Sequence, residues 1–157
     1  MHVVNDSAVL FFASLTLHTW RIILLSAVAQ WLLGALWFGV VFRKSWRALA
    51  GFAEGQKPKN SAFGLGASFV ANLLLAFVLA HLLGVLTNLA ALAHSTGPVT
   101  FAAGARLGII CWLGFLAPPL FTQHIFENRR ANLFAINAGY WLLAMALGGG
   151  ILAAFHG

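Results

Sequence analysis

Four long apolar blocks, separated by short segments rich in charged, Gly and Pro residues, dominate the pattern of this sequence; they cover residues 22–42, 62–86, 101–121 and 133–155. A helix needs about 20 residues to cross a hydrocarbon core of about 30 Å. The blocks also lack the alternation of apolar and polar positions that is typical of barrel strands. Since a span in lipid must satisfy its own backbone hydrogen bonds, the pattern predicts helices. We therefore expect an all-α integral membrane four-helix bundle.

The segment that precedes the first block, residues 7–20, is apolar as well. A single helix over residues 8–42 would run about 50 Å, which exceeds the bilayer thickness. We therefore predict a short N-terminal interfacial helix over residues 7–20, within a single membrane domain that covers residues 1–157. The first basic side chain is that of Arg21, so this segment lacks the basic region that opens a signal peptide, and no cleavage is expected.

The composition excludes a soluble protein and a nucleic-acid partner. Hydrophobic residues make up 61% of the chain and charged residues 8%, and the mean hydropathy is +0.90. The net charge of +6 is typical of a nucleic-acid binder in a soluble protein, but here the basic side chains lie between the apolar blocks. The expected partners are therefore membrane lipids.

The basic residues are divided unequally between the two sides of the membrane. Seven fall on one side, namely Arg43, Lys44, Arg47, Lys57, Lys59, Arg129 and Arg130, and only Arg21 and Arg106 fall on the other. Lys and Arg accumulate in cytoplasmic loops. This asymmetry predicts that both termini lie outside the cytoplasm.

Small residues four positions apart mark the faces on which membrane helices approach each other closely. Three such pairs occur in the last two spans: Gly104 with Gly108, Ala135 with Gly139, and Ala144 with Gly148. We expect these residues to face other helices, either within one chain or across a homodimer.

A first group of polar residues falls in the outer half of the predicted spans. By helix rise, His81 and Arg106 lie at comparable depth, and Gln30 lies close to them. Ionisable residues within a membrane are candidates for a functional site. These three side chains are therefore candidates for a pocket that opens outward. The alternative is that Arg106 extends to the lipid phosphates and His81 lies in the interface.

A second group lies near the predicted cytoplasmic surface. Glu127 precedes the last span next to two arginines, and Asn137 and Tyr140, three positions apart, are expected to share one helix face. The simplest interpretation of Glu127 is an ion pair, and the alternative is a proton carrier. Asn72, nearer the middle of its span, is expected to form an interhelical hydrogen bond.

No metal site is predicted. His124 and Glu127 have a spacing that would place them on one helix face, but a site needs at least one more ligand. The other histidines are scattered, so haem is not favoured and the cofactor is unknown. The single cysteine, Cys111, belongs to no metal or redox motif, and motifs of hydrolases and nucleotide-binding proteins are absent from the sequence.

Two stretches, GALWFGVVFRKSWRAL and WLGFLAPPLFTQHIFENRRANLFAINAGYW, resemble a bacterial family of small four-helix integral membrane proteins known only as a domain of unknown function. The positions that match the family pattern are Trp37, Phe38, Lys44, Trp46, Trp112, Gly114, Phe115, Glu127, Asn137, Gly139 and Tyr140. Arg43 departs from the pattern, which has Gly there. The resemblance implies the four-helix fold and a bacterial inner membrane, and no known activity. It also adds Trp37 and Trp46 to the candidates of the second group.

Three functions agree with these observations. The first, which we favour, is binding or transport of a small apolar or weakly polar molecule, and a homodimer would suit so small a protein. The second is a structural or accessory subunit of a membrane complex. The third is an enzyme acting on a lipid or isoprenoid, with Glu127 or His81 as acid or base and Tyr140 as a hydrogen-bond donor.

Overall fold

The computed structural model describes residues 17–53, 56, 61–94 and 97–155, and its regular elements are all helical over these ranges. In chain order they are α2 (Leu17–Leu36), the π-helical segment η1 (Trp37–Val41), α3 (Arg43–Leu49), α4 (Ser61–Leu92), α5 (Phe101–Cys111), the π-helical segment η2 (Trp112–Leu116), α6 (Ala117–Phe126) and α7 (Ala131–Ala154).

Four helical stretches of the described chain are long and apolar enough to span a membrane: Thr19–Val41, Ser61–Ala90, Phe101–Phe126 and Ala131–Ala154. The prediction of an all-α protein with four spans is therefore confirmed. The second and third stretches extend four and five residues beyond the predicted ends at positions 86 and 121. The sequence analysis missed these turns because it ended each apolar block at the first polar residue, Thr87 and Thr122.

The predicted N-terminal interfacial helix falls mainly on residues 7–16, which lie outside the described residues. Its last part, residues 17–20, forms the first turn of α2 instead. The apolar pattern did not predict α3, a short helix that follows the first span directly and carries three basic residues, Arg43, Lys44 and Arg47.

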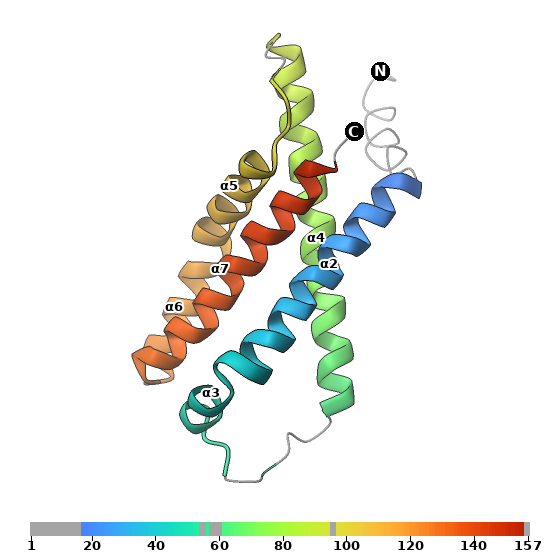
Figure 1. Cartoon of the computed structure of the whole chain (residues 1–157). Coiled ribbons are helices and arrows are strands. Elements are labelled where there is room, and N and C mark those ends of the chain that lie inside the picture. The colour runs from blue at the N-terminus through green and yellow to red at the C-terminus, as the bar shows by residue number, and fades with distance from the viewer. Residues whose placement is uncertain (1–16, 54–55, 57–60, 95–96, 156–157) are drawn as a thin grey trace, which may run out of the picture.

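Helix α7 is the central helix of the fold, and it packs against α2, α4, α5 and α6 (Figure 1). Half of its apolar stretch is buried, against 17–22% for the other three. The buried core contains mostly aliphatic side chains from these helices: Ile23, Ala27, Ala76, Leu79, Leu83, Cys111, Met145, Leu152 and Ala153. The position of α7 makes it the element that can bring side chains of all the others together.

The closest approach is between α5 and α7. A Cβ on Gly108 would overlap the carbonyl group of Met145, and a Cβ on Gly104 would overlap that of Gly149. Gly148 is buried as well, against Gln30 and Ser26 of α2. The expected contacts of Gly104, Gly108 and Gly148 are therefore confirmed within one chain, and Ala144 is fully buried.

The pair Ala135 and Gly139 behaves differently from the other small pairs. Gly139 contacts the indole ring of Trp37 at 3.3 Å from its ideal Cβ position, but Ala135 is exposed. The expected contact of Ala135 with another helix is therefore not made within one chain.

Candidate functional site

A cavity of about 660 Å³, here called the central cavity, lies between α2, η1, α3, α4 and α7. Its volume is in the range of about 300–1,000 Å³ that is usual for small-molecule sites. The lining is mainly aromatic or small and includes a few polar and basic side chains: Trp31, Gly34, Ala35, Phe38, Gly39, Arg43, Trp46, Arg47, Leu65, Ser68, Ala71, Asn72, Tyr140 and Trp141.

The cavity exists because α2 and its continuation η1 present small residues towards a helix that diverges from them. The N-terminal end of α4 lies well apart from α3 and the end of α2 (Figure 1). Gly39 has nothing within 4 Å of its ideal Cβ position, whereas Gly34 has the ring of Tyr140 at 3.0 Å. Gly39 therefore borders the open part of the cavity, and Gly34 allows the Tyr140 ring to pack at its edge.

The polar side chains that α4 contributes to the cavity wall, with their neighbours Trp31 and Tyr140, are bonded to one another or to the backbone. The Tyr140 hydroxyl donates to Oδ1 of Asn72 at 3.3 Å, and Nδ2 of Asn72 donates to the carbonyl of Ser68 at 2.8 Å. The Trp31 indole N–H donates to Oγ of Ser68 at 3.1 Å. The expected interhelical hydrogen bond of Asn72 is thus confirmed. The wall consequently offers few unsatisfied polar atoms to a ligand.

The aromatic residues of the second group separate in the structure. Phe38 packs against both Tyr140, at 5.0 Å between ring centroids, and Trp46, at 5.4 Å, so these last two side chains share the central cavity. Trp37 does not line it. Its indole N–H donates to the carbonyl of Ile136 at 3.0 Å and thereby ties η1 to α7.

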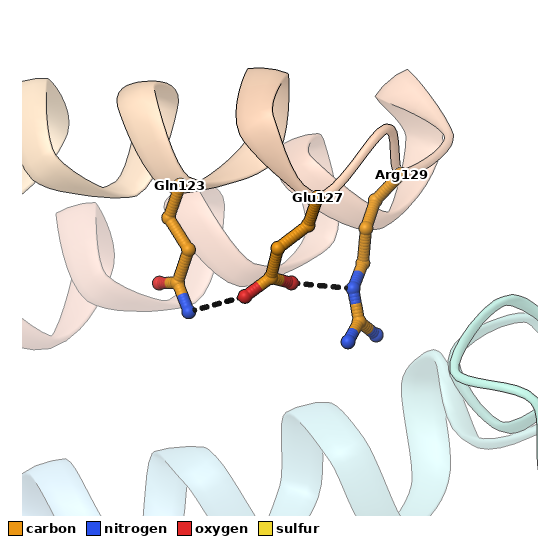
Figure 2. Close-up of polar contacts among 3 residues, drawn as sticks. All are labelled: Gln123, Glu127 and Arg129. Carbon is orange, nitrogen blue, oxygen red and sulfur yellow. Dashed lines mark hydrogen bonds and ion pairs between the residues drawn. The ribbon is translucent and has the colours of Figure 1, made fainter.

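Glu127 and Asn137 line a different cavity of about 250 Å³ between α6 and α7. Figure 2 shows that the side chains of Gln123, Glu127 and Arg129 form a row along one side of the α6–α7 turn. Gln123 donates to Glu127 at 2.8 Å, and Arg129 forms an ion pair with it at 2.6 Å. The expected ion pair of Glu127 is therefore confirmed.

These contacts hold the pKa of Glu127 below its ordinary value, through the hydrogen bond from Gln123 first and that from Arg129 second. The carboxyl group is exposed, so its charged form is also well solvated. A carboxylate in this setting is a poor proton acceptor at neutral pH.

Asn137 and Tyr140, which were expected to share one helix face, do not contribute to the same cavity. The two residues line separate cavities, because positions three apart on a helix differ by about 60° and α7 is covered on both sides. Tyr140 faces α2 and α4, while Asn137 faces α6.

The outer group does not form one cluster in the described structure. Gln30 is fully buried, and its amide donates to Oγ of Ser26 at 3.1 Å, which in turn donates to the carbonyl of Gly148 at 3.1 Å. His81 bonds the carbonyl of Phe77 at 2.8 Å within its own helix. Arg106 is exposed and bonds within α5. α4 and α5, which carry His81 and Arg106, make little contact with each other, and the amide of Gln30 is bonded to Ser26 on its own helix.

Among the described residues, no group of three His, Cys, Asp or Glu side chains could hold a metal ion. His124 packs its ring on Phe134 at 5.3 Å, and Glu127 bonds Gln123 and Arg129. His124 and Glu127 line the same small cavity between α6 and α7, without a third His, Cys, Asp or Glu ligand among the described residues.

The model of one protein family, described as a protein of unknown function (DUF1761), matches residues 22–153. The chain belongs to the DUF1761 family. This agrees with the resemblance to a domain of unknown function. No curated protein and no solved structure matches the chain.

Several residues of the central cavity in this DUF1761 protein were not among the candidates from the sequence, above all Gly39, Arg43 and Arg47. The two arginines were interpreted only as topology signals. Their spacing directly after a span was the available signal for a shared role, because residues four apart lie on one face when the segment is helical.

Proposed function

We propose that this DUF1761 protein binds a small apolar or weakly polar molecule in the central cavity. The observation that supports this is a cavity of ligand size, lined mainly by aromatic and small side chains and placed within the spanning helices. Small-molecule sites have this character, an apolar surface with a few polar groups that orient the ligand. Transport of the bound molecule is the natural extension of this function.

The proposed setting is a bacterial cytoplasmic membrane, with both termini outside the cytoplasm. The unequal distribution of basic residues supports this orientation. It places α3 and the adjacent end of the central cavity at the cytoplasmic side. A ligand would then enter from the cytoplasmic leaflet or from the cytoplasm.

Photolabelling tests this proposal in vesicles of phosphatidylcholine. The probe is a hexadecyl alcohol that carries a diazirine, and adducts are mapped by peptide mass spectrometry. We expect adducts on Trp31, Trp46 or Trp141 in addition to adducts on Ile110, which is 66% exposed on the outer surface of α5 and serves as the reference for the bulk lipid. Adducts confined to Ile110 and similar surface residues would contradict the proposal.

Two glycine variants form a matched pair for this experiment. Gly39 and Gly114 each lie at the third position of a π-helical segment that begins with Trp, and neither has an atom within 4 Å of its ideal Cβ position. Only Gly39 lines the central cavity. Gly39→Leu should therefore lower cavity labelling, whereas Gly114→Leu should leave it unchanged.

A further inference from the structure

The central cavity is charged at one end only. Arg43 and Arg47 line it at the α3 end, and its lining contains no acidic residue. The described part of the chain has one carboxylate, that of Glu127, which is paired with Arg129 at the α6–α7 turn. The described structure therefore leaves the positive charge at this end of the cavity without a neutralising carboxylate.

The two arginines differ in the contacts that their guanidinium groups make with the protein. Arg47 donates to the carbonyl of Gln56 and lies over the ring of Phe52, with its guanidinium carbon 5.3 Å from the ring centroid. Arg43 forms no hydrogen bond or ion pair with the described residues, and its side chain is exposed. Arg43 is thus the basic group that is free to bind an anion at the cavity.

The remainder of the wall suits a hydrocarbon chain. Its polar groups, those of Trp31, Asn72 and Tyr140, are already hydrogen-bonded within the protein. An apolar group that packs against them leaves no donor or acceptor newly unsatisfied, so the desolvation cost is small. The positively charged donors of the cavity lie at the α3 end, on Arg43 and Arg47.

From this asymmetry we infer that the ligand is a single-chain anionic amphiphile, whose carboxylate or phosphate monoester headgroup binds Arg43 and whose hydrocarbon chain fills the aromatic part of the central cavity. A guanidinium group binds either headgroup through two parallel hydrogen bonds. The volume of about 660 Å³ fits one small molecule. This inference rests on the proposed function and specifies its ligand class.

The test compares three photoactivatable probes with the same hexadecyl chain and an alcohol, carboxylate or phosphate headgroup. Each is added to the protein in phosphatidylcholine vesicles, and adducts in the cavity are divided by those on the lipid-facing reference, Ile110. We expect at least one anionic probe to label the cavity more strongly than the alcohol. The carboxylate and phosphate arms distinguish a fatty acid from a lipid phosphate monoester, and either result supports the inference.

Arg43→Gln and Lys44→Gln are the matched variants for the headgroup. Both remove one positive charge from neighbouring exposed residues, but Lys44 does not line the cavity. Arg43→Gln should lower the preference for the anionic probe about tenfold, the effect of losing a charge-assisted hydrogen bond. Lys44→Gln should leave this preference nearly unchanged, and Arg43→Lys should retain part of it.

Two outcomes would overturn the inference: equal labelling by the three probes, or equal effects of Arg43→Gln and Lys44→Gln. In these cases the alcohol still labels the cavity, so the proposed function survives without its anionic ligand. Absence of cavity adducts with all three probes contradicts the proposed function itself. Labelling by the alcohol also reports whether each variant retains a formed cavity.

Discussion

The contact between α5 and α7 provides the sharpest test of the fold, through the substitution Gly108→Ala. The new Cβ would overlap the carbonyl oxygen of Met145 and lie 2.6 Å from its carbonyl carbon, whereas ordinary contact begins at 3.4 Å. The two helices must therefore separate locally by about 0.8 Å to clear the carbonyl carbon, and by more to clear the nearer oxygen. The obstructing atoms belong to the backbone of α7 and cannot be relieved by a change of rotamer.

The cost follows from this displacement. A gap of about 0.5–1 Å removes about a quarter to a half of the dispersion energy of each affected atom pair. Overpacking of a well-packed core costs about 1–3 kcal/mol, and a backbone obstacle favours the upper part of that range. We expect Gly108→Ala to lower the free energy of unfolding by about 2–3 kcal/mol. For a chain of this size the melting temperature should fall by about 4–12 °C.

The protein contains a convenient reporter for this measurement. Cys111 is the single cysteine, and it lies on α5 one turn after Gly108 with 5% of its surface exposed. A thiol-reactive fluorophore therefore reacts only when this part of the protein opens, and a thermal ramp in mild detergent gives the melting temperature. The control is Gly114→Ala, where a Cβ meets nothing within 4 Å. If both variants melt at the same temperature, the close α5–α7 contact is refuted.

Three further predictions concern the polar groups and the orientation. Gly148→Ala places a methyl group 2.8 Å from Cδ of Gln30, so it should destabilise the protein by about 1–3 kcal/mol. In a thermal double-mutant cycle with Gln30→Ala, the double variant should lose less stability than the two single variants lose in sum. Additive losses would contradict the contact. Hydrogen bonds from Gln123 and Arg129 lower the pKa of Glu127. The stability that its carboxylate contributes is therefore complete above the ordinary glutamate pKa of about 4.3. This stability is lost as the pH falls through the lower pKa of Glu127 in the folded protein. Gln123→Ala should raise the Glu127 pKa in a carboxyl ¹³C NMR titration, and an unchanged midpoint would count against the hydrogen bond. A Lys44→Cys variant in inverted membrane vesicles should react with an impermeant maleimide, and protection there with reaction in intact cells would reverse the proposed orientation.

The second polar group shows how far sequence patterns can reach. Glu127 was correctly assigned to an ion pair, because Arg129 is only two residues away and the partners are joined by a short turn. The hydrogen bond of Asn72 to another helix was also predicted, since an amide within a span needs a partner. The convergence of Trp37, Asn137 and Tyr140 on one site was not correct. That prediction was based on similar depth in the membrane and did not consider the direction in which each side chain points around its helix.

The central cavity could not be predicted from local sequence patterns. Gly39 and Gly114 occupy the same place in two similar Trp-containing segments, yet only Gly39 borders a cavity. The difference comes from α4, which crosses α2 (Figure 1) and whose residues line the cavity together with Gly39. A crossing angle is set by the packing of whole helices, and the residues at one end do not specify it.

The sequence by itself determined that this protein is helical, that it has four spans and that its basic residues favour one orientation, because length, hydropathy and backbone hydrogen bonding in lipid act residue by residue. Only the tertiary structure decided that α7 is central, that Gln30 is buried against Gly148 away from Arg106, and that Arg43 borders the same cavity as Tyr140. These relations depend on how helices far apart in the chain rotate and cross. Small residues such as Gly108 permit that packing, but the partner of each is chosen by the fit of the whole assembly.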